Sequence, residues 1–300
     1  MQFEHIGMVG YGEVGKVFSA GLKSRAAHVC TWDLKLADSA QPEQAAALRT
    51  HAGGVGVSVA ESMAQLCAES NLLISAVTAS NTLSVAQAAA PHIRPGTVFL
   101  DLNSASPGTK QQAAQLIDGA GGHYVEAGVM TSVPPYGIRV PMLLGGARAA
   151  ELAEVLKLWG LDARAVSVDL GVASAIKMCR SVMIKGLEAL VIESYATARA
   201  YGVEDHVLPT LVETFPSIDW SKQGAYFFSR VVQHGKRRAE EMREAANTVQ
   251  EAGFPPFMSQ AIADKQQWVA EQAALGLFDG IDKEATWQDY ADRLTAAFPR

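Results

Sequence analysis

The chain has 300 residues, of which 49% are apolar and 19% charged, and its formal net charge at pH 7 is −6. This length suits two domains, and the composition excludes a disordered or low-complexity protein. The acidic balance argues against nucleic acid or an anionic membrane surface as a partner, because either would require a basic binding surface. No apolar run reaches the roughly 18 residues that span a bilayer.

Two further features concern the cellular compartment. We expect no signal peptide, because residues 1–5 lead directly into a strand pattern without a basic and an apolar region. The three cysteines, Cys30, Cys67 and Cys179, lack the spacing of metal ligands, and their odd number fits a reducing compartment. The sequence therefore predicts a cytoplasmic globular protein without a metal site.

The first half of the chain alternates between apolar strand patterns and helical patterns. We expect strands at 3–9, 28–33, 71–77, 97–102, 125–129, 142–144 and 165–168, and helices at 12–25, 80–90 and 106–117. Such alternation implies a parallel sheet wound by right-handed crossovers. The predicted fold class is α/β, with a doubly wound Rossmann domain over residues 1–165.

In the second half, helical patterns replace the alternation of strands and helices. Residues 173–201 contain no proline and a single glycine, which predicts one long interdomain helix. Further helices are expected at 230–253, 256–275 and 287–297, with Thr286 as the N-cap of the last. Residues 166–300 are thus predicted to form the long helix and an all-α domain for substrate binding and dimerisation. We expect a homodimer, because the long helix exposes more apolar surface than a small helical domain can cover.

A glycine-rich loop follows the first predicted strand and opens the first predicted helix. It consists of Gly10, Tyr11, Gly12, Glu13, Val14 and Gly15. In a G-x-G-x-x-G loop the first glycine allows the tight turn, the second lets the backbone approach a pyrophosphate, and the third lets the helix pack on the sheet. The phosphates then lie at the helix N-terminus. The loop therefore predicts a dinucleotide site and a small-molecule substrate.

An acidic residue follows the second predicted strand. Asp33 lies 23 residues after Gly10, where a carboxylate would accept hydrogen bonds from the adenosine ribose hydroxyls. It would also repel a 2′-phosphate, so we expect NAD, with NADP still possible because Lys35 is close. Val77, the last residue of a further predicted strand, and Thr78 after it are also predicted cofactor contacts.

Polar side chains form a line along the long helix. Ser174, Lys177, Ser181, Lys185 and Glu188 fall within an arc of roughly 80° at 100° per residue. The stripe is either a solvated face or the lining of the cleft where a substrate meets the nicotinamide. In the second case a lysine can take or return the proton of a substrate hydroxyl during hydride transfer. Lys177, nearest the start of the helix, is the predicted general acid/base.

These motifs, in this order, resemble the β-hydroxyacid dehydrogenase superfamily, which includes 3-hydroxyisobutyrate dehydrogenases and is related to 6-phosphogluconate dehydrogenase. Residues 6–15 (IGMVGYGEVG) and 32–34 (WDL) are similar to its cofactor loop and NAD-selecting strand end. Residues 101–107 (DLNSASP) resemble its segment beside the nicotinamide, which implies that Asn103 holds substrate and nicotinamide in register. Residues 171–178 (GVASAIKM) resemble the segment with the family's catalytic lysine, which gives Lys177 that role.

The sequence also departs from the family pattern. Residues 126–132 read EAGVMTS where the family has Asp-x-Pro-Val-Ser-Gly-Gly, its substrate-carboxylate motif. Ser181 replaces an expected asparagine. Ile184 stands where 6-phosphogluconate dehydrogenase has its second acid, which does not support its decarboxylating mechanism. Related imine reductases usually lack the lysine that is present here.

The C-terminal half resembles a subgroup with a domain of unknown function, described as NAD-binding phosphogluconate dehydrogenases. We expect Ser132, Ser181 and Lys185 to orient the substrate. In the wider family a lysine on the corresponding late helix approaches the cofactor, and the resemblance implies that Arg238 or Arg237 replaces it. The predicted function is an NAD(P)-dependent dehydrogenase acting on a small hydroxy or keto compound that carries a carboxylate. Two alternatives stay open: a reductase of imines or larger carbonyl compounds, and a catalytically silent dinucleotide-binding protein.

Overall fold

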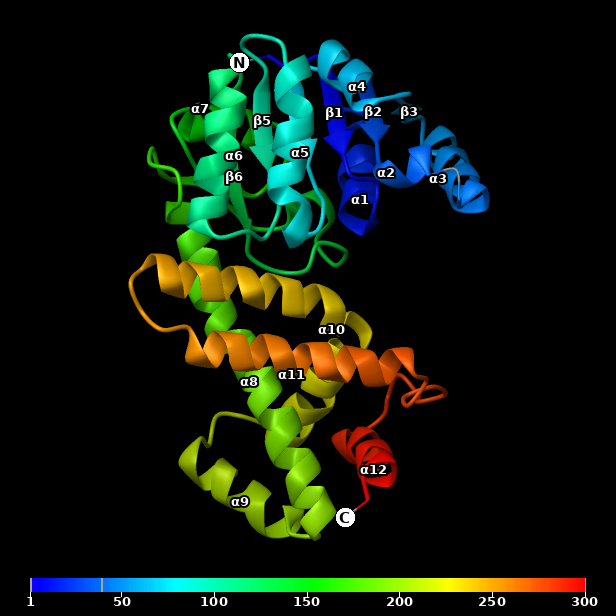
Figure 1. Ribbon diagram of the computed structural model, residues 1–300, viewed down its shortest axis with the longest axis vertical. Coiled ribbons are helices and arrows are strands. Elements are labelled where there is room, and N and C mark those ends of the chain that lie inside the picture. The colour runs from blue at the N-terminus through cyan, green and yellow to red at the C-terminus, as the bar shows by residue number, and fades with distance from the viewer. Residues whose placement is uncertain (1, 39, 300) are drawn as a thin grey trace. The chain divides into compact units, whose positions relative to one another are not determined.

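The N-terminal half of the chain forms one eight-stranded sheet within the described residues (Figure 1). The computed structural model describes residues 2–38 and 40–299. The strands are β1 (His5–Val9), β2 (His28–Trp32), β3 (Ser58–Val59), β4 (Leu72–Ser75), β5 (Val98–Asp101), β6 (His123–Val129), β7 (Met142–Gly145) and β8 (Ala163–Ser167). Their order is β3-β2-β1-β4-β5-β6-β7-β8. The predicted α/β class with a Rossmann sheet is confirmed.

One strand pair differs from the expected parallel arrangement. β6 and β7 pair antiparallel, with Glu126 opposite Gly145, whereas every other neighbouring pair of the sheet is parallel. The segment between them holds only the short 3-10 helix η3 (Gly137–Arg139). A parallel return usually crosses the sheet through an α-helix, and residues 130–141, all of which the structure describes, form none, so the chain comes back antiparallel.

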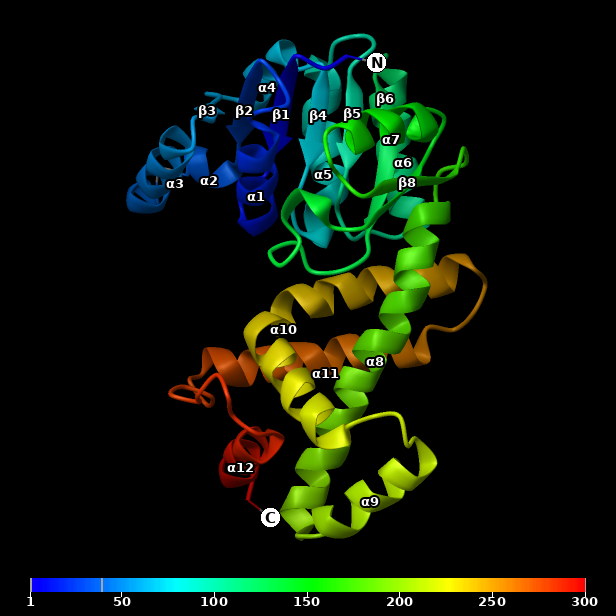
Figure 2. The ribbon, with the colours of Figure 1, turned by 180° about the vertical axis from the view of Figure 1, so that it is seen from behind.

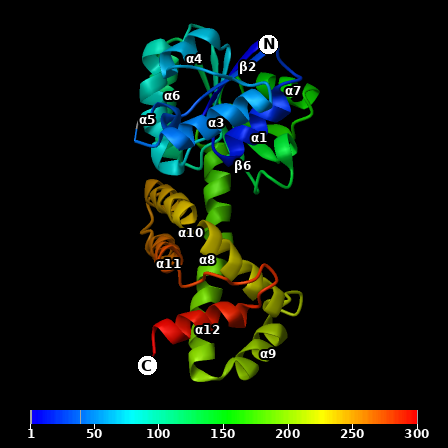
Figure 3. The ribbon, with the colours of Figure 1, turned by 90° about the vertical axis from the view of Figure 1, so that its right-hand side faces the viewer.

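Helices cover both faces of this sheet. They are α1 (Glu13–Leu22), α2 (Leu34–Ala37), α3 (Pro42–Gly54), α4 (Met63–Glu69), α5 (Thr82–Ala89), α6 (Pro107–Gly119) and α7 (Ala149–Leu158). Figure 3 shows α1 and α7 on one side of the sheet and α4, α5 and α6 on the other. Each central strand is therefore buried on both faces.

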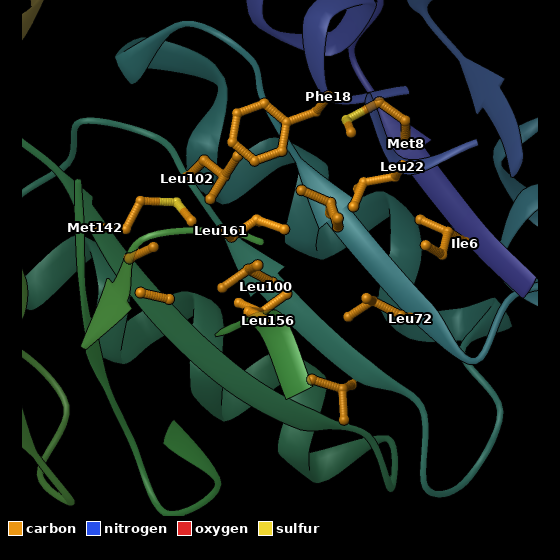
Figure 4. Packing of buried hydrophobic residues seen from close by; sticks show 14 of the residues in the cluster. Ile6, Met8, Phe18, Leu22, Leu72, Leu100, Leu102, Met142, Leu156 and Leu161 are labelled. Atoms are coloured by element: carbon orange, nitrogen blue, oxygen red, sulfur yellow. The ribbon is translucent and has the colours of Figure 1, made fainter. Parts of the chain in front are cut away.

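This double burial explains why the strands read as continuous apolar runs. In β1, Ile6 and Met8 pack with Phe18 and Leu22 of α1 in one cluster of buried residues (Figure 4). The intervening residues of the strands face the other cluster, to which Leu73 contributes with side chains of α4, α5 and α6. Alternate side chains of one strand thus fill two separate cores.

Helices make up the C-terminal half within the described residues. They are α8 (Val172–Tyr201), α9 (Glu204–Thr214), α10 (Trp220–Glu251), α11 (Phe257–Ala274) and α12 (Trp287–Ala297). α10 and α11 run side by side (Figure 2). The helix α10 begins ten residues before the predicted start at 230. Thr286 caps α12 through a reciprocal capping box with Asp289, as predicted.

The chain divides into two compact units, Met1–Met178 and Cys179–Arg300, each with its own core. The N-terminal unit includes the first two turns of α8, so it extends beyond the predicted domain end at residue 165. The core of the C-terminal unit includes the buried rings of Tyr195, Phe228 and Trp287. Among the described residues, no helix is both long and apolar enough to cross a membrane.

Candidate active site

The glycine loop between β1 and α1 has little room for side chains at two of its three glycines. Gly10 has φ +92°, and a Cβ there would lie 2.5 Å from the carbonyl oxygen of Ala76. A Cβ on Gly15 would lie 1.9 Å from the carbonyl oxygen of Gly10. The first glycine is therefore required by the turn and the third by the close approach of helix and loop, as the motif predicts.

The middle glycine differs, because a Cβ on Gly12 would meet no heavy atom within 4 Å. Gly12 is the N-cap residue of α1 and has no side chain to accept the first N–H groups of the helix. Open space before the positive end of a ten-residue helix fits a pyrophosphate. The next two predicted cofactor-binding residues come directly after Gly12: Glu13 is exposed, and Val14 is half-buried against the core.

Asp33 lies beside this loop at the end of β2. Its Oδ2 accepts a hydrogen bond of 2.6 Å from the Tyr11 N–H, and its Oδ1 accepts one of 2.9 Å from the Lys35 N–H. The Tyr11 ring is buried, which raises its pKa, and its hydroxyl lies 3.1 Å from Nδ1 of His51. The structure thus brings the predicted ribose-binding carboxylate against the predicted phosphate-binding loop.

Asn103 connects the loops that follow β4 and β5. Its Oδ1 accepts a 2.7 Å hydrogen bond from the Val77 N–H, and its Nδ2 donates to the Ser75 hydroxyl at 3.0 Å. The side chain is buried, and the protein already uses both ends of its amide. Asn103 therefore holds the loop of Val77 and Thr78 in place at the carboxyl edge of the sheet.

A buried charged network that the sequence interpretation missed lies at the end of β5. Lys110 of α6 is 0% exposed, and its Nζ lies 3.0 Å from Oδ1 of Asp101. Asp101 also accepts hydrogen bonds from the Asn103 N–H and the Tyr124 hydroxyl. Burial, and then the Asp101 charge, raise the pKa of Tyr124 well above its usual value. Lys110 lies on the buried face of α6 with Ala113, Ala114 and Ile117, an i, i+3, i+4, i+7 spacing that could have indicated its burial but not its partner.

The predicted general acid/base lies at the same edge. The Nζ of Lys177 donates a hydrogen bond of 2.5 Å to the hydroxyl of Ser104, the residue after Asn103. Gly128 of β6 makes this approach possible, because a Cβ there would lie 2.9 Å from the Ala173 carbonyl oxygen and 3.5 Å from Cβ of Lys177. The N-terminal unit therefore brings the lysine together with the segment that follows β5.

The predicted substrate residues fall in both units. Ser132 lies half-buried in the loop after β6. In the C-terminal unit, the Nζ of Lys185 lies 2.7 Å from Glu241 and 3.4 Å from the Ser181 hydroxyl. The buried Arg238 forms an ion pair with Glu188 through two of its nitrogens. Both cations thus have a counter-charge within their own unit.

Two family models match the chain. Residues 5–160 match the model described as the NAD binding domain of 6-phosphogluconate dehydrogenase. Residues 198–269 match a domain of unknown function, DUF1932. The first match covers strands β1 to β7 and the glycine loop, and the second lies in the helical half.

Solved structures of similar proteins extend over nearly the whole chain. A conserved hypothetical protein from Sinorhizobium meliloti 1021 is 37% identical, with a TM-score of 0.75 and coverage of 97% of this chain and 96% of that one. The conserved protein MTH1747, described as structurally similar to 3-hydroxyacid dehydrogenases, is 30% identical (TM-score 0.67; coverage 90% and 99%). A Mycobacterium tuberculosis 3-hydroxyisobutyrate dehydrogenase, solved with L-serine, is 16% identical and shares the fold (TM-score 0.65; coverage 98% and 99%).

Proposed function

Since the chain belongs to the β-hydroxyacid dehydrogenase family of NAD-binding oxidoreductases, we propose that it moves a hydride between a nicotinamide and a small hydroxy or keto compound. The proposed substrate carries a carboxylate, and Lys177 is the general acid/base. The observation that carries this assignment is the hydrogen bond of the Lys177 amine to the Ser104 hydroxyl, three residues after the end of β5. Ligands of doubly wound sheets bind outside the carboxyl ends of the strands, which is where this amine lies.

In this proposal, separate residues bind the cofactor and transfer the proton. The loop from Gly10 to Gly15 binds the pyrophosphate, and Asp33 accepts hydrogen bonds from the adenosine ribose, which favours NAD over NADP by repulsion of a 2′-phosphate. When bound, the nicotinamide supplies or accepts the hydride. Lys177 takes the proton from the substrate hydroxyl during oxidation and returns it to the carbonyl oxygen during reduction. Comparison of kcat/KM for the two cofactors tests the preference.

The substitution Lys177→Met tests the central role. Loss of a positioned general acid/base should lower kcat by about 10²-fold or more and leave the Kd for NADH unchanged. Lys157→Met is the matched control, because Lys157 is an exposed lysine of α7 that pairs with Glu154. Near-normal turnover of Lys177→Met would remove this lysine from the mechanism.

One feature supports a second candidate, a reductase of imines or larger carbonyl compounds. Met130, Thr131 and Ser132 stand where the family has Ser-Gly-Gly, its carboxylate-binding segment. A panel of 3-hydroxy acids with NAD, run beside ketones and imines with NADH, separates the two candidates by their kcat/KM values. Steady turnover of any member also excludes a catalytically silent nucleotide-binding protein.

The predicted homodimer is part of this proposal. In the C-terminal unit, α8 exposes 65% of Met183, 38% of Ile184 and 56% of Leu190. Large apolar side chains exposed along one helix favour burial against another chain. Light scattering at micromolar concentration should give twice the monomer mass, and the monomer mass would contradict the proposal.

A further inference from the structure

Glu126 is a fully buried carboxylate on an inner strand of the sheet. It lies on β6, opposite Asp101 of β5 and Gly145 of β7, and is 0% exposed. A buried carboxylate is stable only where hydrogen bonds or counter-charges replace its water. The structure provides hydrogen bonds: Oε1 accepts from the N–H of Gly171 at 2.8 Å and from that of Ala173 at 3.0 Å.

Gly171 directly precedes α8, and Ala173 is the second residue of this helix. The first N–H groups of a helix have no partner within the helix, and a negative charge there also interacts favourably with the helix dipole. Glu126 therefore caps α8 from another element. Its second oxygen, Oε2, has no hydrogen-bond partner among the described residues. The hydrogen bonds of the carboxylate at Oε1 therefore go to the start of α8.

The face of β6 that carries Glu126 also contacts α8 near Lys177. Gly128 lies two residues after Glu126, on the same side of the strand, and leaves room for the Ala173 carbonyl oxygen and for Cβ of Lys177. Lys177 follows Ala173 by one helical turn. The rotation of this first turn about the helix axis and its shift along that axis thus set the position of the Lys177 Cβ atom.

We infer that Glu126 is a positioning residue, which fixes the first turn of α8 and so sets the Lys177 amine at Ser104. The inference rests on the proposed function, because the position of the amine affects turnover only if Lys177 transfers the proton. A misplacement of about 1 Å at a reacting group can lower turnover by up to roughly 10²-fold. Glu126→Gln keeps the shape of the side chain and removes its charge, and is therefore the test variant.

The first experiment needs no substrate. Apo protein is treated with an amine-acetylating reagent, and mass spectrometry follows each lysine with time. In Glu126→Gln, the half-buried Lys177 should react at least about threefold faster because the helix start loosens. The buried Lys110 and the exposed Lys157 should keep their wild-type rates. An unchanged rate at Lys177, or equal acceleration at Lys110, would overturn the inference, since the latter reports general opening of the fold.

The second experiment is a double-mutant cycle with the most active substrate of the panel above. Glu126→Gln should lower kcat about tenfold with an unchanged Kd for NADH. In the Lys177→Met background the same change should lower kcat by less than about twofold. Additive losses would overturn the inference. Glu154→Gln, which removes an exposed carboxylate of the same unit, is the control.

Two further outcomes are distinguishable. Normal turnover of Lys177→Met alone would overturn the proposed role of Lys177, whereas the labelling result would still report what Glu126 does to the helix. If Glu126→Gln does not fold, Glu126→Asp replaces it. Aspartate keeps the charge, but its side chain is one methylene shorter and should hold the two N–H groups less well. Lys177 in this variant should be labelled faster than in the wild type, and a wild-type rate would contradict the inference.

Discussion

At the scale of single residues, the three glycines of the loop make a contrast that can be measured. Gly12→Ala should keep the wild-type Tm, because its methyl group meets no protein atom. It should weaken NADH binding by roughly tenfold or more, because the methyl group fills the space that we propose for the pyrophosphate. Gly15→Ala should cost about 1–3 kcal/mol of stability, because its methyl group overlaps the Gly10 carbonyl oxygen. Thermal unfolding and NADH fluorescence titration measure the two effects. Equal losses of Tm would contradict the assignment.

How far the sequence predicts the site depends on the range of the interaction. The position of Asp33 beside the glycine loop could be predicted, because the spacing of these residues follows a known motif. Lys110 and Glu126 were missed, since their partners lie on other elements: Lys110 reaches Asp101 across nine residues, and Glu126 reaches Gly171 across 45. Only the folded sheet brings these groups together.

At the scale of elements, the buried pair of Lys110 and Asp101 ties α6 to the end of β5. Lys110→Met should destabilise the fold by about 3–5 kcal/mol, because it leaves the Asp101 carboxylate buried with no cation. Lys157→Met is the matched control and should cost at most about 1 kcal/mol, since it breaks an exposed pair on α7. Urea unfolding of both variants measures the difference, and equal midpoints would show that the buried pair contributes nothing.

Element boundaries were predicted less well where packing overrides local preference. α10 was expected from 230 and begins at Trp220, after Asp219, whose side chain accepts from the Lys222 N–H. Gly224 lies inside this stretch and would normally weaken a helix. Here a Cβ on Gly224 would lie 2.6 Å from the ring of Tyr195, so the glycine allows two helices of the C-terminal unit to pack. This packing is a tertiary contact, which a single sequence does not reveal.

At the scale of the whole molecule, the fold class could be predicted because it depends on residue patterns that persist over many residues. Alternating strand and helix patterns predict the sheet, and the long run without proline predicts α8. The boundary differs, because the hydrogen bonds of Glu126 to Gly171 and Ala173 fasten the start of α8 to the sheet unit. A helix that looks like one element in the sequence thus belongs to two units.

The stability of the whole chain should decrease as the pH rises above about 9. The thiols of Cys30 and Cys67 lie in the same buried cluster, where burial raises the pKa from 9.0 to about 11 and about 12. The unfolded chain therefore releases these protons first, so this stability is complete below pH 9 and is lost as the pH rises through 11 to 12. Between pH 9 and pH 10, each thiol should lower the free energy of unfolding by ~1 kcal/mol. Urea unfolding across this range should give a smaller slope for Cys67→Ala, whereas Cys179→Ala, which removes an exposed thiol, should keep the wild-type slope.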